Sequence, residues 1–286
     1  MRLEATARDL AFAVRTFARA PLAAATIVVT VAIGLGAVAV LFTILNTFVF
    51  RDDIVPDISQ IYAVERPRLA DDVKDLFPRE RFEALRRETA VFTDAYGAVP
   101  DIDIHVDGRT MAVVLVTSNF FDVVRVKPRM GRALTAADDS RAGGNPVMVL
   151  SDKGWRRRFN NDPNVLGRSV LVGGTAFEIV GVMPAGFRGL EVSGPDLWAP
   201  LSQLPQFRPD FRGREDQVRV DIVGRLKPDV SPASALAQLS AWEANQSPGV
   251  SDRHETNIRL APRTGTVPQP MEAMAVFAPL FLAFGL

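Results

Sequence analysis

The chain has 286 residues, with 33 Lys and Arg balanced by 33 Asp and Glu, two histidines and no cysteine. The balanced charge and the lack of a Lys/Arg-rich tract give no indication of nucleic-acid binding. The absence of cysteine excludes disulfides, thiolate metal sites and cysteine nucleophiles, and two histidines far apart in sequence supply a histidine-based site poorly.

The first nineteen residues form a pattern that predicts an amphipathic helix lying in the headgroup region of a membrane. Apolar residues recur at spacings of three and four from Leu3 to Phe17, while Arg8, Arg15 and Arg19 occupy another face. An ordinary basic flank without a docked helix is the alternative interpretation of residues 1–19.

Residues 20–50 contain no charged residue, and these 31 positions exceed the roughly 20 needed to cross a bilayer as a helix. The run is too long for a signal peptide and ends in bulky residues, so we predict a retained transmembrane helix. Its helical length of about 45 Å exceeds the hydrocarbon layer of about 30 Å, which predicts an outward stalk. Because arginines precede the run, we expect a cytoplasmic N-terminus and residues 51–270 outside.

Small and polar residues form one stripe along this predicted span. Such a stripe lets two helix backbones approach closely, which predicts a packing face against other transmembrane helices. The alternative is that Ala and Gly are simply common in spans. The stripe consists of Ala25, Ala32, Gly36, Ala39, Thr43 and Asn46.

The region after the span alternates short strands and helices, which predicts an α+β domain with two lobes. Gly173-Gly174 is expected to form the turn of a β-hairpin, Ser118 and Asn119 to cap a short helix, and residues 205–213 to cross between the lobes. We predict strands at 60–65, 109–117, 147–150, 170–172, 177–182, 218–226 and 257–260, and helices at 78–88, 120–124, 151–159 and 232–245.

A second uncharged run begins at Ala273 and continues to Leu286. With Pro279 inside it and a length of about 21 Å, it is short for a crossing. We therefore expect residues 271–286 to be the start of an incomplete second transmembrane helix, in a fragment or a truncated form of a longer protein.

Several ordered blocks of the sequence resemble MacB-type (FtsX-like) ABC transporter permeases, in particular those without an ATPase domain of their own. The blocks are DLAFAVR at 9–15, VTSNFFDV at 116–123, VLSD at 149–152, WRRRF at 155–159, DPNVLGR at 162–168 and FEIVGVMP at 177–184. The residues that carry the resemblance are Asn119, Phe120, Phe121, Pro128, Gly131, Arg132, Ser151, Trp155, Arg158, Phe159, Gly167, Gly181 and Pro184.

This resemblance implies a bacterial inner-membrane protein with a cytoplasmic N-terminal helix, a first span, a periplasmic core domain and three further spans. It also implies a separate ABC ATPase subunit, a second permease half or a homodimer partner, contact with membrane lipid, and a periplasmic partner protein or substrate. ATP-driven movement of the spans would be passed to the outer domain.

No motif in the chain predicts catalysis or a cofactor. Gly173-Gly174 is interpreted as a turn, because the phosphate-binding pattern G-x-x-x-x-G-K-[ST] does not occur. Trp155 and Phe159 are expected to be core anchors, and residues 156–158 a solvated helix face. Asp101, Asp103 and Asp107 alternate along an expected strand edge, with His105 between them, and lack the glycine and closing glutamate of a calcium loop. We expect a protein that is not an enzyme.

Two other functions remain as alternatives to a transport permease. The outer domain of an FtsX-like protein would relay a signal to a periplasmic partner such as a cell-wall hydrolase. A single-pass binding or adhesion ectodomain would have no connection with ABC systems.

Overall fold

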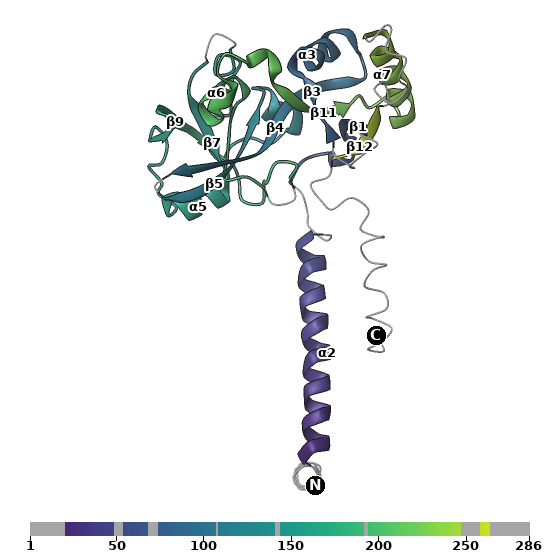
Figure 1. The fold of residues 1–286 in the computed structure, drawn as a ribbon, viewed down its shortest axis with the longest axis vertical. Helices are drawn as coiled ribbons and strands as arrows, with labels where there is room; N and C mark the ends of the chain where they lie inside the picture. Colours follow the sequence, from purple (N-terminus) through teal and green to yellow (C-terminus); the bar gives the residue numbers. More distant parts are fainter. Residues whose placement is uncertain are drawn as a thin grey trace. The chain divides into compact units, whose positions relative to one another are not determined.

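The computed structural model describes residues 21–48, 54–67, 74–106, 108–140, 144–191, 194–246 and 258–263 (Figure 1). The chain divides into two compact units, one of Met1–Arg51 with Val267–Leu286 and one of Asp52–Thr266. The predicted amphipathic helix at 1–19 and the second apolar run at 271–286 lie outside the described residues.

The described part of the first unit is a single helix, α2 (Pro21–Phe48), 28 residues long. The hydroxyls of Thr26, Thr30 and Thr43 each donate to the carbonyl four residues earlier, so these polar groups are satisfied within the helix. Over the residues that the structure describes, none of the helices combines the length and the apolarity that a membrane crossing requires. The prediction of a helix is confirmed here, whereas the prediction of a membrane span stays a prediction.

All members of the predicted packing stripe belong to α2. The members whose side chains are described are exposed: Ala25, Ala32, Gly36, Ala39 and Thr43. The side chain of Asn46 lies outside the described part.

The second unit is built on one sheet, with twelve strands among its described residues, in the order β12-β1-β11-β4-β5-β10-β7-β9-β6. Strands β2, β3 and β8 are attached to β1, β11 and β9. The strands are β1 (Ile61–Pro67), β2 (Lys74–Asp75), β3 (Phe77–Pro78), β4 (Phe92–Val106), β5 (Arg109–Val116), β6 (Met130–Gly131), β7 (Val147–Leu150), β8 (Ser169–Val172), β9 (Thr175–Val182), β10 (Leu197–Pro200), β11 (Arg219–Leu226) and β12 (Arg259–Pro262).

Strand β4 divides the sheet into two parts, one with β12, β1 and β11 and one with β5, β10, β7, β9 and β6. Helices lie against both parts, with α3 and α7 beside β11 and β12 and α5 and α6 beside β7 and β9 (Figure 1). The α-helices are α3 (Arg79–Glu88), α4 (Phe120–Val124), α5 (Asp152–Phe159), α6 (Leu204–Phe207) and α7 (Pro232–Gln246). The 3-10 helices are η1 (Ile58–Gln60), η2 (Leu201–Gln203), η3 (Pro209–Phe211) and η4 (Glu215–Gln217).

Strand β4 belongs to both parts of the sheet. Its residues 92–98 pair with β11 and its residues 98–106 pair with β5, with a register shift between Val99 and Ile102. Asp101 lies at this irregularity with φ 57°, the left-handed conformation that a bulge often requires. Because one strand continues through the shift, the two parts share a backbone within the compact unit of residues 52–266. The prediction of two lobes stays a prediction.

The sequence predicted most of the other elements correctly. The hairpin around Gly173-Gly174 is confirmed, with β8 and β9 antiparallel, and β12 begins two residues later than expected. The predicted crossing segment 205–213 does connect the two parts, because it lies between β10, which pairs with β5, and β11, which pairs with β4. Of strand β4 only the part from Asp101 onward was expected, and β10 and the two-residue strands β2, β3 and β6 were missed. Prolines and charged residues interrupt or border β4 and β10.

Buried apolar side chains form two clusters on opposite faces of the sheet. Along β5, Val113 and Leu115 belong to one cluster and Val114 and Val116 to the other, as strand alternation requires. The first cluster contains the buried residues of α3, α6 and α7, and the second contains those of α4. Helix α4 therefore covers the face opposite to these other helices.

Gly181→Ala is expected to destabilise the domain by roughly 2–3 kcal/mol, because the added atom cannot be accommodated without moving backbone. A Cβ at position 181 would lie 2.2 Å from the carbonyl oxygen of Arg132. Chemical denaturation followed by tryptophan fluorescence measures the change. Gly97→Ala is the control, because its Cβ would lie 3.4 Å from the side chains of Phe82 and Val220; an equal loss in both variants would contradict the argument.

Candidate functional site: the α4 clamp

Helix α4 is five residues long, and Phe120, Phe121, Val123 and Val124 in it are buried. A helix of this length has no stability of its own. Its position must therefore come from packing and from polar contacts at its two ends. We call the side chains that make these contacts the α4 clamp; they are Asp94, Thr117, Asn119 and Arg225.

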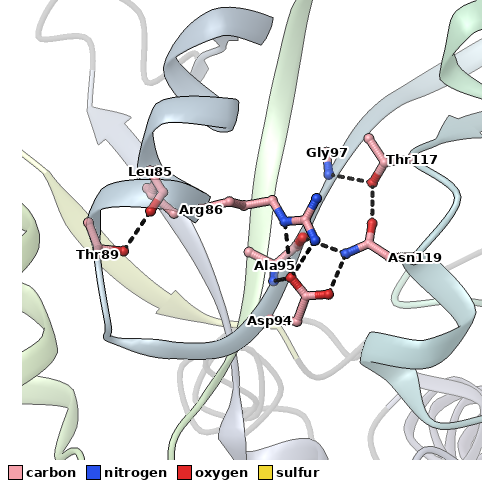
Figure 2. A network of polar contacts seen from close by, with 8 residues as sticks. All are labelled: Leu85, Arg86, Thr89, Asp94, Ala95, Gly97, Thr117 and Asn119. Atoms are coloured by element: carbon pink, nitrogen blue, oxygen red, sulfur yellow. Dashed lines mark hydrogen bonds and ion pairs between the residues drawn. The ribbon is translucent and has the colours of Figure 1, made fainter. Parts of the chain in front are cut away.

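At the N-terminal end, Asn119 links α4 to strand β4 (Figure 2). Its amide nitrogen donates to Asp94 Oδ2 and to the carbonyl of Ala95, both at 2.8 Å. Its amide oxygen accepts from Thr117 Oγ1 at 2.7 Å, and that hydroxyl accepts from the N–H of Gly97 at 3.1 Å. Asn119 occupies the predicted N-cap position, and its carbonyl accepts from the N–H groups of Asp122 and Val123. Its side chain makes no capping hydrogen bond, because it binds β4 instead.

Asp94 is also the contact of helix α3 with this network. Arg86 Nε donates to Asp94 Oδ1 at 3.0 Å, and Thr89 closes the end of α3 by donating from Oγ1 to the carbonyl of Leu85 (Figure 2). Both partners of the Arg86–Asp94 pair are partly exposed, so its contribution is about 0–1 kcal/mol. Asp94 thus receives hydrogen bonds from both α3 and the start of α4.

At the C-terminal end, Arg225 of β11 holds the last turn of α4. Its side chain is buried, Nε donates to the carbonyl of Val123 at 2.9 Å, and Nη1 donates to the carbonyl of Asp57 at 3.0 Å. Burial lowers the pKa of Arg225 and the charge of Arg125 lowers it further, while Asp57 opposes this. Arg225 thereby joins α4 to residues 54–60, which we call the entry segment.

The two ends of the clamp are paired in the sheet. Arg225 and Asp94 are direct partners in the register of β11 and β4. Opposite residues of an antiparallel pair project on the same face, so neighbouring strands provide one holding residue for each end of α4.

Phe120 and Phe121 anchor α4 in an aromatic cluster with Tyr96, Phe187 and Trp198. Ring centroids are 4.8 Å apart for Tyr96 and Phe120 and 5.8 Å apart for Phe121 and Trp198, within the range of favourable aromatic pairs. Burial raises the pKa of Tyr96, and the charge of the nearby Arg263 partly offsets the rise.

Arg263 is the last residue of the domain that the structure describes. It donates from Nη2 to Glu191 Oε1 at 2.7 Å and from its backbone N–H to the carbonyl of Ile61 at 2.9 Å. The chain that leaves β12 is therefore fastened beside the same aromatic cluster.

Two adjacent aspartates connect Arg132 with the turn that precedes α4. Asp138 is buried and accepts hydrogen bonds from both terminal nitrogens of Arg132, from Thr135 and from Asn145. Burial would raise the pKa of Asp138, but these hydrogen bonds outweigh it and lower the pKa to about 2.

Asp139 fixes two backbone segments with one carboxylate. Oδ2 accepts from the N–H of Ser118 at 3.2 Å and Oδ1 from the N–H of Ser202 at 2.8 Å. Burial raises its pKa, although these backbone hydrogen bonds and the charge of Arg79 act in the opposite direction. The turn before α4 is consequently tied to η2.

The remaining residues of the family-like blocks lie in or next to β6, α5 and β9. Ser151 caps α5 by accepting from the N–H of Gly154 at 2.9 Å, and Trp155 is buried with its indole N–H donating to the carbonyl of Asp162. Gly131 has φ 70°, and a Cβ there would lie 2.1 Å from the carbonyl oxygen of Val180. In this second group, Pro128, Arg158, Phe159 and Pro184 are half-buried, Gly181 is buried, and Gly167 is exposed.

Sequence reasoning missed Asp57, Asp94, Asp138 and Arg225. Of these, only Arg225 had a local signal, since it interrupts the apolar pattern of a predicted buried strand at 218–226. Asp101, Asp103 and His105 are exposed, and Asp107 lies outside the described residues. Within the described ranges, no group of three or more His, Asp or Glu is arranged to hold a metal ion.

Comparison with known proteins gives one family and several similar folds. Residues 24–242 match the family described as MacB-like periplasmic core domain. The periplasmic region of MacB from Actinobacillus actinomycetemcomitans is 14% identical with a TM-score of 0.53, over 82% of this chain and 96% of that one. A domain of a putative permease protein from Porphyromonas gingivalis is 18% identical with a TM-score of 0.50, over 78% of this chain and 99% of that one. No curated protein is a significant match.

Asp138→Asn is expected to remove an acid-dependent part of the domain's stability. The folded-state pKa of about 2 lies below the ordinary value of about 3.9, so the carboxylate stabilises the fold above pH ~4. This contribution is lost as the pH falls from ~4 to ~2. Unfolding followed by tryptophan fluorescence from pH 5 to pH 2 should show a shallower loss in the variant than in the wild type.

The control for this measurement is Asp122→Asn, an exposed aspartate on α4. It should leave the acid-induced loss unchanged. Equal pH dependence of the wild type and Asp138→Asn would contradict the assignment.

Proposed function

The chain belongs to the family of MacB-like periplasmic core domains, and from that premise we propose that it is the permease component of a MacB/FtsX-like ABC transport system. In this proposal residues 52–266 form the extracytoplasmic domain, and movement of the membrane part is passed to it. The substrate would be a molecule outside the inner membrane.

The observation that carries the proposal is the fastening of the entry segment to the centre of the sheet. Arg225 binds the carbonyl of Asp57 and the carbonyl of Val123 with one guanidinium group. A displacement of the entry segment would therefore act on α4, and through Asn119 and Asp94 on β4 and α3. A rigid connection of this kind is what a mechanically driven domain requires.

We further propose that residues 20–50 cross the inner membrane with the N-terminus in the cytoplasm. This rests on the sequence: the run lacks charge, and Arg2, Arg8, Arg15 and Arg19 precede it. The small residues of α2 would pack against spans of a second permease half or a second copy of the chain, and the rest of its surface would contact lipid. Residues 273–286 would begin the next span.

ATP hydrolysis in this proposal comes from a separate ABC ATPase subunit. The chain has no phosphate-binding loop pattern, and the groups of the α4 clamp make their hydrogen bonds to neighbouring parts of the same domain. The role of the domain would be mechanical and not catalytic, and a periplasmic protein or exported molecule would be what it acts on.

The proposed topology can be tested by single-cysteine labelling, because the natural chain contains no cysteine. In intact cells, a membrane-impermeant maleimide should label Ala237→Cys, at an exposed position of α7, once it has passed the outer layers. It should label Thr6→Cys only after the inner membrane is permeabilised. Labelling of position 6 but not position 237 in intact cells would contradict the proposal.

The proposed coupling can be tested on the assembly purified with its ABC ATPase. ATP should change the maleimide labelling rate of Ser59→Cys, an exposed position in the entry segment, severalfold, and leave that of Ala237→Cys unchanged. An ATPase that turns over without any change at position 59 would contradict coupling through this segment.

A further inference from the structure

Arg225 leaves one arm of its guanidinium group unused. Nε and Nη1 donate to the carbonyls of Val123 and Asp57, but the buried Nη2 has no acceptor among the described residues. A buried charged donor without a partner is costly. An acceptor within reach would therefore be bound in some state of the domain.

The carboxylate of Asp57 is such an acceptor. The carbonyl of the same residue already binds Arg225 at 3.0 Å, so rotation about the Cα–Cβ bond of Asp57 brings its carboxylate toward the same guanidinium. In this structure the carboxylate instead accepts from Arg125 Nη1 at 3.2 Å, in a pair whose side chains are 58% and 47% exposed. Exposed pairs of this kind contribute little to stability.

Both partners of this exposed pair have left-handed backbones. Asp57 has φ 50° and ψ 44°, and Arg125 has φ 58° and ψ 34°. Aspartate adopts this conformation at little cost, whereas it is uncommon for arginine, and uncommon backbone conformations collect in switch regions. Here Arg125 pairs with the carboxylate of Asp57, and the buried Arg225 binds the carbonyl of the same residue.

We propose that Arg225 is the positioning residue of the entry segment, and that the Asp57 carboxylate exchanges between Arg125 and the free Nη2 of Arg225. The outer position keeps the carboxylate hydrated and leaves Nη2 unpaired. The inner position pairs Nη2 at the cost of desolvating the carboxylate and releasing Arg125. The free energy gained by pairing Nη2 and the free energy lost by desolvating the carboxylate oppose each other. A small displacement of the entry segment therefore determines whether the carboxylate binds Arg125 or Arg225.

The use of this exchange for coupling rests on the proposed function, whereas the exchange itself does not. It can therefore be tested by unfolding the full chain in detergent, without any ATPase. The three tryptophans, Trp155, Trp198 and Trp242, all belong to the domain and report on its melting temperature.

The test is a double-mutant cycle of Arg125→Gln and Asp57→Asn. Asparagine tolerates the left-handed backbone as aspartate does, so the change at 57 removes charge without adding strain. If the carboxylate moves to Arg225 when Arg125 is absent, Asp57→Asn in the Arg125→Gln background lowers the melting temperature further, by about 2–4 °C. If Arg125 is its only partner, Asp57→Asn has no further effect there, and the proposal is overturned.

Arg225→Lys identifies the second partner. Lysine keeps the charge but lacks the planar guanidinium whose several N–H groups bind two carbonyls and a carboxylate at once. In a chain that carries Arg225→Lys as well as Arg125→Gln, Asp57→Asn should therefore have no further effect. An undiminished effect would overturn the role of Arg225. The matched control cycle is Arg208→Gln with Asp210→Asn, a pair elsewhere in the domain whose side chains are similarly exposed, where the second change should add nothing.

A crystal structure of Arg125→Gln decides the question even if Arg225→Lys fails to fold. The Asp57 carboxylate should lie about 3 Å from Arg225 Nη2. A carboxylate that remains in solvent, away from Arg225, would overturn the exchange.

Discussion

The shared strand β4 is the constraint on which the rest of the domain depends. One half of it pairs with β11 and the other with β5, so a single backbone carries the hydrogen bonds of both parts of the sheet. The irregularity between Val99 and Ile102 allows the strand to change register without ending. Asp94, which receives contacts from α3 and from Asn119, lies on this strand. A force that acted on α4 would consequently act on β4, the strand that connects the two parts of the sheet.

How much could be predicted from the sequence depended on the range of the interactions involved. The Gly173-Gly174 turn and the helices around Phe82 and Trp155 follow from local patterns, and all were found. Of strand β4 only the part from Asp101 onward was expected. Pro100 and several charged residues break its apolar alternation, and pairing with two distant strands makes the whole segment one strand. Likewise Asn119 was expected to cap a helix, as its local position suggests, whereas a residue 25 positions away, Asp94, takes its side chain.

The residues recognised in the family-like blocks have structural roles that their sequence does not display. Gly131 and Gly181 permit close approach of β6 and β9 backbones, and Arg132 orders the loop that carries Asp138 and Asp139. Asp139 then holds the N–H groups of Ser118 and Ser202. The loop that Arg132 orders thus stabilises the turn at Ser118, which precedes α4. The partners that complete this arrangement could not be inferred without the fold, because nothing in their neighbourhood marks them.

Apolar packing holds the interior of the domain, whereas polar contacts hold its end segments, and the two kinds of contact differ in how easily they rearrange. Between the sheet and α4 the contacts are aromatic, and such packing cannot change without opening a cavity at a cost of several kcal/mol. At the two ends of the domain the contacts involve charged side chains. Where the chain enters, Arg225 donates to the carbonyl of Asp57 and Arg125 pairs with its carboxylate, and where it leaves β12, Arg263 pairs with Glu191. When charged groups exchange partners, the net change in free energy is smaller, because the cost of desolvation and the gain from pairing oppose each other. A domain with these contacts would keep its interior packing while its end segments change partners, which is what the coupling put forward under Proposed function requires.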